Sequence, residues 1–327
     1  MATTKSNLEL AEECDSFPYP GTEAHTAFLS TTYTLLHDSI PIGYILESVF
    51  NALAKVPIRI KGELEVSRKD RTITWPIFPT EQERSKAVAD TCQYWRENKT
   101  FEVLAGWRNE LYAVYGEKNE LIWNVERSAS CLFGVVTYGV HMSCYTLLNE
   151  AEKEENGTKH GFKLWLPRRA RSKQTYGGML DNTVAGGIAS GEEPFDSLVR
   201  EADEEASLPA EHVRGHAKDV GTVTYIHIRE ARAGGEGGLV QPETEYVYDL
   251  ELPQEMVPKP QDGEVECFYL WTVEECLETL GKGEFKPNCA VVVLDFLVRW
   301  GVIVGEEGKE ISRRVHRKLE FPGPHGT

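Results

Sequence analysis

The most regular pattern of apolar and polar positions in the chain lies between residues 194 and 208. Apolar residues recur there at the three- and four-residue spacing of one helix face, at Phe195, Leu198, Val199, Ala202 and Ala206. At about 100° per residue these positions form a single stripe. The pattern predicts an amphipathic helix whose apolar stripe packs on a hydrophobic core.

The first 130 residues mix the helix and strand periods. They predict a helix, an alternating segment, a short strand and a turn into a strand, over residues 42–53, 58–61, 72–75 and 106–115 respectively. Thr80 and Glu83 form a capping box, which predicts the start of a second helix. The inward positions of that helix are Val88, Cys92 and Trp95.

The pattern from residue 133 onward is rich in strands, which are predicted over residues 133–145, 162–166, 220–228 and 245–252. A polar turn joins the first two strands into a hairpin. The last two are joined by the glycine-rich residues 233–238, which predict a flexible hairpin tip rather than a phosphate-binding loop because no helix start follows. Residues 287–300 predict a largely buried closing helix with Pro287 in its first turn.

These patterns divide the chain into three parts. Residues 1–130 are predicted to form a smaller N-terminal α+β domain, residues 131–305 an α/β domain, and residues 306–327 a charged, peripheral C-terminal tail. With 327 residues and 41% hydrophobic content, the chain is long enough to bury the cores of two domains.

Three carboxylates gather on one face of the helix predicted at residues 194–208. Glu201, Glu204 and Glu205 lie at i, i+3 and i+4, and like charges at these spacings each cost about 0.2–0.5 kcal/mol. The last two also lie in the final turn, where the helix dipole disfavours anions. One interpretation is a solvated acidic face, and the other is a cation site. Oxygen ligands without histidine or thiolate favour Mg²⁺ or Mn²⁺ over zinc.

The surrounding residues favour the cation site. The chain closely resembles the Nudix hydrolases in the spacing of Gly186, Glu192, Arg200, Glu201, Glu204 and Glu205. The resemblance implies an α/β/α sandwich with a mixed sheet and a hydrolase of diphosphates. It also implies that Glu201, Glu204 and Glu205 bind Mg²⁺ or Mn²⁺, that one of them or a downstream glutamate activates the attacking water, and that Arg200 pairs with Glu192. Ser207 stands where the family usually has glycine, which affects the helix end rather than the metal ligands.

Two further segments carry candidate residues. Just before the signature lies the densest positive patch of the chain, where Arg169, Arg171 and Lys173 are candidates for binding the terminal phosphate. The alternative is a solvated basic loop. Downstream, strand alternation puts Glu264 and Glu266 on one face. Because Nudix enzymes often recruit one more glutamate, Glu264 is the catalytic candidate, against the alternative of two solvent-facing acids.

Composition narrows the expected partners. The formal net charge of −17 repels polyanions, so nucleic acid is not an expected partner. The seven cysteines are odd in number and contain no CxxC pair, which predicts reduced thiols in a cytosolic protein. No apolar stretch is long enough for a membrane span, and the first residues lack an apolar signal core. We therefore expect a cytoplasmic location and no membrane partner.

Segments outside the signature narrow the resemblance. Taken in their order along the chain, they resemble the Nudix hydrolases related to thiamine pyrophosphokinase, which carry a characteristic N-terminal domain. The segments are residues 107–110, 126–127, 133–141, 165–169, 173–176, 180–182 and 262–266. That resemblance implies metabolite damage repair. The enzyme would hydrolyse thiamine diphosphate, and preferentially its damaged or analogue forms such as oxo- and oxythiamine diphosphate, to the monophosphate and phosphate.

Alternatives to this substrate stay open at the level of the sequence. The chain could be a nucleoside-diphosphate-sugar or ADP-ribose pyrophosphatase, or a non-catalytic Nudix-like binding or regulatory module. Trp107, Tyr176 and Trp271 are candidates for contact with substrate rings, although such residues more often pack in a core or at its rim. The expected partner is a small-molecule diphosphate, bound by a monomer or a homodimer.

Overall fold

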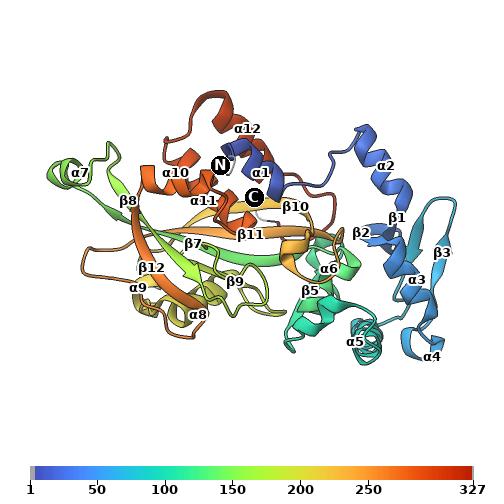
Figure 1. Cartoon of the computed structure of the whole chain (residues 1–327). Coiled ribbons are helices and arrows are strands. Elements are labelled where there is room, and N and C mark those ends of the chain that lie inside the picture. Colours follow the sequence, from blue (N-terminus) through green and yellow to red (C-terminus); the bar gives the residue numbers. More distant parts are fainter. Residues whose placement is uncertain (1–3, 326–327) are drawn as a thin grey trace.

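A computed structural model describes residues 4–325. Two domains lie side by side (Figure 1), a smaller one in blue to green and a larger one whose sheet runs from green to orange. The smaller domain carries its own sheets and helices, and the larger has helices on both faces of a mixed sheet. The predicted fold class, an α+β domain followed by an α/β/α sandwich, is therefore confirmed.

The N-terminal domain contains a four-stranded and a two-stranded sheet. The first has the spatial order β2-β1-β4-β3 and comprises β1 (Thr32–His37), β2 (Ile40–Leu46), β3 (Glu65–Ser67) and β4 (Thr72–Thr74). The second pairs β5 (Leu111–Tyr115) with β6 (Leu121–Glu126). The helices are α2 (Glu23–Thr31), α3 (Glu47–Lys55), α4 (Ile58–Lys61), α5 (Glu81–Glu97) and α6 (Ser130–Phe133), with the 3-10 turns η1 (Glu102–Gly106), η2 (Glu117–Asn119) and η3 (Arg127–Ala129).

Two local predictions in this domain are wrong. Residues 42–53 do not form one helix, because their first half belongs to β2 and only the second half to α3. Antiparallel pairing with β1 buries Ile42 and Ile45 and overrides the helical spacing of the apolar residues. The alternating residues 58–61 form the short helix α4, which ends at Gly62 with a φ of 75°.

The capping box of this domain is confirmed. The Thr80 hydroxyl accepts a hydrogen bond from the Glu83 amide at 3.3 Å, and the Glu83 carboxylate accepts one from the Thr80 amide at 3.2 Å. These two bonds satisfy amides that α5 leaves without helical partners. Val88, Cys92 and Trp95 are buried as predicted.

The larger domain is built on a six-stranded mixed sheet. Its spatial order is β10-β11-β7-β8-β12 with β9 paired to β7, and its strands are β7 (Thr137–Leu147), β8 (Phe162–Arg169), β9 (Val184–Gly187), β10 (Lys218–Ile228), β11 (Val240–Glu251) and β12 (Val265–Thr272). β7 and β11 are parallel, and the other pairs are antiparallel. The predicted pairs β7–β8 and β10–β11 are confirmed.

Helices cover both faces of this sheet (Figure 1). On one face lie α8 (Pro194–Ala206) and α9 (Ala210–His216), and on the other lie α1 (Asn7–Cys14), α10 (Val273–Gly281), α11 (Pro287–Arg299) and α12 (Gly305–Val315). Even-numbered residues of β7 pack on α8, whereas Tyr145 packs in the core that contains α11. The predicted stripe of α8 is buried, with Phe195 partly buried at its edge.

Ser207 ends α8 in the left-handed conformation, with φ 52° and ψ 34°. Its hydroxyl donates to the Lys259 carbonyl at 3.0 Å, which ties the helix end to the segment before β12. This bond helps to hold a non-glycine residue in a conformation that glycine adopts more easily.

Two connections differ from their predictions. The polar turn between β7 and β8 contains a helix, α7 (Glu150–Asn156). The glycine-rich connection between β10 and β11, which includes η4 (Ala231–Ala233), is anchored rather than a free tip. The Glu236 carboxylate accepts hydrogen bonds from the amides of Glu102 at 2.5 Å and Val103 at 3.0 Å. This connection therefore docks the larger domain on the smaller one.

The predicted peripheral C-terminal tail is wrong, because the segment after residue 305 completes the larger domain. Its buried apolar side chains are Ile311, Val315, Leu319 and Phe321. The first two pack beside α1 and α11, and the other two join the core around α8. Since α1 packs on α11, residues 7–14 also belong to the larger domain rather than to the predicted N-terminal domain.

The structure bears on the predicted reduced thiols and on the expected lack of a membrane-spanning segment. All seven cysteines are free, and all except Cys267 are buried, which agrees with the predicted reduced thiols. Across residues 4–325, no helix combines the length and the apolar character needed to cross a membrane.

Arg317 joins the two ends of the chain. Its side chain is buried, and its Nη1 lies 2.9 Å from the Asp15 carboxylate. The guanidinium also donates to the carbonyls of Phe17 at 2.6 Å and Pro18 at 2.9 Å. A buried guanidinium with these three polar contacts holds the segment after α12 against the segment after α1.

Replacing Arg317 by alanine should lower the free energy of unfolding by about 3–5 kcal/mol, because it leaves Asp15 as an uncompensated buried charge. Urea denaturation followed by circular dichroism measures the loss. Lys309→Ala is the control, since the pair of Lys309 with Glu306 is exposed and should contribute less than about 1 kcal/mol. Equal losses in the two variants would contradict a structural role for Arg317.

Candidate functional site

A cavity of about 430 Å³ opens between the two domains. Its floor is the face of the larger sheet that also carries α1 and α11. The acidic edge of α8 forms one wall, and residues from η1 to α6 of the N-terminal domain form the opposite wall. The segments after β8 and before β12 close the remaining side. The lining is mainly polar and charged, as expected of a site for a charged ligand.

Two glycines bring the walls of the cavity together. Gly186 and Gly187 end β9, which lies between α8 and the N-terminal domain. A Cβ at Gly186 would overlap the Glu201 side chain, and a Cβ at Gly187 would overlap the hydroxyl of Tyr112. Consecutive strand residues point to opposite faces. The pair therefore lets an acid of one domain and a tyrosine of the other pack against the same strand.

The three acids of α8 differ in their surroundings. Glu205 is buried and accepts a hydrogen bond from the Ala185 amide at 2.9 Å. The side chain of Glu201 is 15% exposed, and that of Glu204 is 48% exposed. Burial raises the pKa of Glu205 well above its ordinary value, with further contributions from nearby acids. Burial also raises the pKa of Glu201, despite the charge of Arg200 beside it.

This donor set fits a hard divalent cation. A nearby positive charge would stabilise the charged forms of two largely buried carboxylates, and all the donors are oxygen. Arg200 supplies part of that charge, since its Nη1 lies 2.9 Å from Glu201 and 3.1 Å from Glu204. Over the described part of the chain, no three His, Cys, Asp or Glu side chains already form a complete metal site. Glu201 and Glu204 would therefore have to turn from Arg200 toward the cation.

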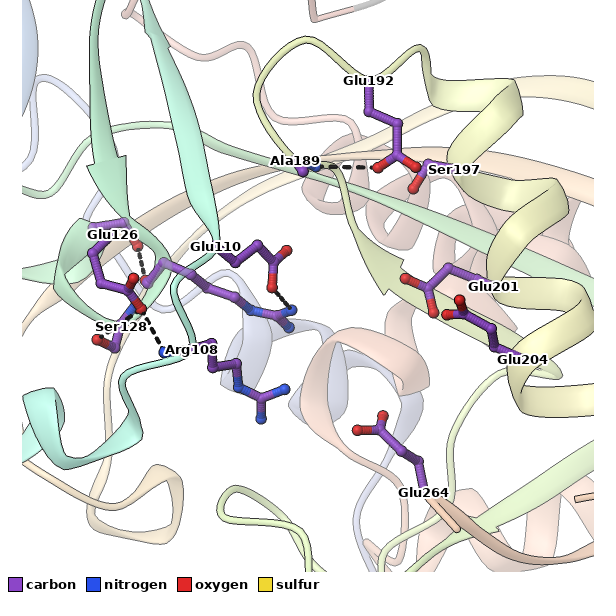
Figure 2. A network of polar contacts seen from close by, with 12 residues as sticks. Arg108, Glu110, Glu126, Ser128, Ala189, Glu192, Ser197, Glu201, Glu204 and Glu264 are labelled. Atoms are coloured by element: carbon purple, nitrogen blue, oxygen red, sulfur yellow. Dashed lines mark hydrogen bonds and ion pairs between the residues drawn. The ribbon is translucent and has the colours of Figure 1, made fainter. Parts of the chain in front are cut away.

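Arg200 also makes the contact that the resemblance implies. Its Nε and Nη2 donate to the two carboxylate oxygens of Glu192 at 2.9 and 3.1 Å. The same carboxylate accepts a hydrogen bond from the Ala189 amide at 3.4 Å (Figure 2). This bidentate pair ties the loop after β9 to α8.

Glu264, just before β12, lines the cavity together with Lys173, and the two form an ion pair. Burial would raise the pKa of Glu264, but the hydrogen bond and charge of Lys173 outweigh it and lower this pKa overall. Glu266 is exposed and lies outside the cavity. A bulge between Val265 and Cys267 interrupts the strand alternation. The prediction that the two acids share a face is therefore wrong.

The three predicted basic residues occupy different surroundings. Arg169 is buried, is ion-paired with Asp181 and lines the cavity. Lys173 also lines the cavity, through its pair with Glu264. The side chain of Arg171 is 83% exposed, lies 3.8 Å from Glu266 and does not line the cavity. The structure thus brings Arg169 and Lys173 near the acids but turns Arg171 to solvent.

The N-terminal domain supplies cavity residues from segments that the resemblance to the subgroup marked but to which the sequence assigned no role in the site. Arg108, Glu110 and Arg127 line the wall opposite α8. Arg127 donates to Glu110 at 2.9 Å, whereas the guanidinium of Arg108 makes no hydrogen bond or ion pair within residues 4–325. Figure 2 shows Arg108 pointing into the space between Glu110, Glu264 and the acids of α8.

A buried carboxylate holds the loop that carries Arg108. Glu126 is buried and accepts a hydrogen bond from the Arg108 amide at 2.9 Å. The same oxygen lies 3.5 Å from the amide and 3.4 Å from the hydroxyl of Ser128 (Figure 2). The backbone of Arg108 is therefore fixed, while its side chain stays free to contact a ligand.

A second polar group lies deeper on the sheet. The Tyr225 hydroxyl of β10 lies 2.5 Å from Glu243 and 2.9 Å from Glu245, both on β11. His141 of β7 lies 3.6 Å from Glu245 and bonds Asn182 at 2.7 Å. The sequence predicted no role for these residues, because single polar positions along a strand are ordinary. Only the pairing of the three strands brings them together.

Of the three aromatic residues considered for contact with substrate rings, only Tyr176 lines the cavity. Trp107 packs against the N-terminal core, with the Arg96 guanidinium 4.7 Å from its ring centroid. Trp271 stacks on Tyr269 with ring centroids 4.7 Å apart. The two tryptophans are therefore packing residues.

Comparison with known proteins follows the same division of the chain. Residues 140–289 match the family model of the NUDIX domain. The chain belongs to the Nudix hydrolases. This assignment confirms the predicted superfamily and the enzyme class, a hydrolase of diphosphate bonds. Residues 27–137 match a domain of unknown function (DUF4743), which in this Nudix protein supplies one wall of the cavity.

Relatives cover different shares of this Nudix hydrolase. The uncharacterized protein YJR142W of Saccharomyces cerevisiae is 33% identical and aligns with 97% of this chain and 92% of its own length. Nudix hydrolase 20, chloroplastic, of Arabidopsis thaliana is 38% identical over 68% of this chain, which spans only 54% of that protein. Among solved structures, DR0079 of Deinococcus radiodurans is 18% identical with a TM-score of 0.39, and the match covers 56% of this chain and 98% of DR0079.

Mg²⁺ or Mn²⁺ should raise the thermal unfolding midpoint, because a cation stabilises the charged forms of the buried Glu205 and the partly buried Glu201. Burial raises the pKa of both carboxyls above the ordinary value of 4.5. The metal-free protein should therefore lose stability as pH rises from that value through the raised pKa values, and the stabilisation by metal should be larger at about pH 8 than at about pH 5.

Thermal melts with added metal and with EDTA measure this effect. Glu205→Gln should stabilise the metal-free protein and lose most of the response to metal, whereas Glu211→Gln, an exposed acid of α9, should behave as wild type. A wild-type midpoint that does not respond to either metal would rule out the cation site.

Proposed function

We propose that this Nudix hydrolase cleaves a small-molecule diphosphate with Mg²⁺ or Mn²⁺ held by Glu201, Glu204 and Glu205. When bound, the cation neutralises diphosphate oxygens and lowers the pKa of a bound water. The observation that carries the proposal is the cavity between the domains. Its acidic wall can hold the cation, and the unpaired guanidinium of Arg108 on the opposite wall can contact the phosphate.

The other residues of the cavity have roles that follow from their charge. The lowered pKa of Glu264 keeps this carboxylate charged near neutral pH, so it can accept a proton from the attacking water. Lys173 orients Glu264 and carries positive charge at the phosphate side of the cavity. Arg169 is engaged by Asp181, so it acts beneath the acids as a positioning residue.

The proposed substrates are thiamine diphosphate and its damaged or analogue forms, which yield the monophosphate and phosphate. The resemblance of the segments outside the signature supports this choice. The cavity supports it too, because carboxylates line both the α8 wall and the floor at Glu243 and Glu245. Acidic groups around a cavity favour a ligand whose organic part carries positive charge or N–H groups.

A phosphate-release screen with Mg²⁺ and with Mn²⁺ tests the proposal. The expected result is the highest kcat/KM on oxo- and oxythiamine diphosphate, then on thiamine diphosphate, with lower values on ADP-ribose and a nucleoside-diphosphate sugar. A preference for ADP-ribose or the sugar nucleotide would overturn the thiamine assignment but keep the diphosphatase. No turnover of any diphosphate would favour a binding module.

The control for this screen is a pair of matched variants of α8. Glu204→Gln combined with Glu205→Gln should lower kcat by roughly a hundredfold or more with the fold intact, because it removes the charge that holds the cation. Asp203→Asn changes an exposed acid of the same helix and should leave kcat unchanged. Full activity in the double variant would show that the cation is held elsewhere.

Arg108→Ala should raise KM by roughly tenfold or more, since a hydrogen bond to a charged group contributes about 1.5–3 kcal/mol. Steady-state kinetics on the best substrate of the screen measures the change. Arg108→Lys keeps the charge and should recover part of the loss. Arg59→Ala removes an exposed arginine of the same domain outside the cavity and should have no effect. An unchanged KM in Arg108→Ala would remove this residue from the site.

A further inference from the structure

The floor of the cavity has more hydrogen-bond acceptors than donors. Glu243 is partly exposed to the cavity, and its two oxygens have only two protein donors. One is the Thr137 hydroxyl at 3.5 Å, and the other is the Tyr225 hydroxyl at 2.5 Å, which also lies 2.9 Å from Glu245. A hydroxyl carries a single proton, so Tyr225 cannot donate to both carboxylates. A carboxylate can accept about four hydrogen bonds, and Glu243 therefore has acceptor capacity left over.

His227 has a second unused acceptor on the same floor. The side chain is 8% exposed and lines the cavity, and its Nδ1 lies 3.3 Å from the Cys14 carbonyl. A carbonyl only accepts, so Nδ1 carries the proton and Nε2 is left with a lone pair. Nε2 is buried and has no hydrogen-bond partner among the described residues. Burial lowers the pKa of His227 to about 4, which keeps the ring neutral near pH 7.

Neighbouring charges do not remove this shortage of donors. Lys286 also lines the floor, but it forms no ion pair with Glu243 or Glu245 within the described chain. His141 faces Glu245 rather than Glu243, at 3.6 Å. Buried polar groups without partners are rare in native proteins and need an explanation. A ligand with N–H groups would satisfy both acceptors.

The strand register gives the size of this subsite. His227 lies opposite Gln241, and Glu243 lies two residues further along β11, so the two acceptors are diagonal neighbours about 7–8 Å apart at Cα. β10 lies three strand spacings, or roughly 14 Å, from β9. β9 is the strand whose Gly186 lies against Glu201 of α8. Tyr176, on the loop after β8, lines the cavity as well. One ring system and a short linker to a diphosphate fit this span.

We propose that Glu243 and His227 form a specificity subsite that binds the N–H groups of a nitrogen heterocycle, either an exocyclic amine or a ring N–H, on the organic half of the substrate. This inference rests on the proposed diphosphatase function. It adds that the enzyme discriminates among diphosphates by these two acceptors, at the opposite end of the cavity from the acids of α8. Diphosphates without N–H groups would leave His227 Nε2 without a partner and the spare acceptor capacity of Glu243 unused, and would bind more weakly.

The test compares kcat/KM on three diphosphates, of which thiamine diphosphate and ADP-ribose carry an amino heterocycle and dimethylallyl diphosphate carries no N–H group. Glu243→Gln removes the charge with little change in size, and should lower kcat/KM on the amino-bearing substrates by roughly tenfold or more. The value on the alkyl diphosphate should change by less than about twofold. Glu251→Gln, an exposed acid at the end of the same strand, is the matched control.

Equal losses on all three substrates, or no loss on the amino-bearing pair, would overturn the subsite. His227→Gln, which gives the side chain an N–H donor, should show the same selective loss of kcat/KM. This variant serves as the test if Glu243→Gln does not fold. If the wild type hydrolyses ADP-ribose but no thiamine diphosphate, and the selective loss persists, the thiamine assignment fails and the subsite stands. If the protein hydrolyses none of the three diphosphates, their affinities for wild type and variants, measured by calorimetry, should show the same selective loss.

Discussion

The arrangement of this protein depends on a close approach at the end of β9. At Gly186 the strand has no side chain on the face toward α8, and the Glu201 carboxylate fills that space. At Gly187 it has none on the other face, and the Tyr112 hydroxyl of the N-terminal domain fills that space. The strand is thus the contact through which the acidic helix and the smaller domain are held at a fixed separation. The cavity between them exists because backbone, rather than side chains, occupies this position.

The N-terminal domain is consequently part of the site and not an appendage. Its Glu126 holds the Arg108 loop from inside, and its amides at Glu102 and Val103 hold the β10–β11 connection. Both contacts are made by carboxylates that accept backbone hydrogen bonds, which fix a loop more firmly than a salt bridge between flexible side chains. The wall opposite the acids of α8 therefore keeps its shape. Among the described arginines of the cavity, Arg108 is the one whose guanidinium has no partner, and it faces these acids.

The carboxyl groups of the cavity differ in pKa because they differ in burial and in the positive charges beside them. Glu205 and Glu201 lose water without gaining a full counter-charge, so burial raises their pKa values. Glu264 gains Lys173, and its pKa is lowered. Carboxylates of one chemical type thus differ in proton affinity within one cavity. Glu264 therefore holds a proton less tightly than Glu201 and Glu205, and the three carboxylates lose their protons at different pH values.

The local sequence determined the features that need only neighbours along the chain. The stripe and acids of α8 and the capping box at Thr80 follow from helical spacing, and they were predicted correctly. The pair of Arg200 with Glu192 was implied by the resemblance to the Nudix hydrolases and is present. Interactions between distant segments decided the rest. Pairing with β1 made Ile42 part of a strand, a bulge separated Glu266 from Glu264, and burial of Arg317 with Asp15 drew the charged C-terminal segment into the larger domain. Arg108, Glu243 and His227 lie in one cavity only because β10, β11 and the N-terminal domain meet there. No periodicity records such contacts, since they join side chains from separate elements of the chain.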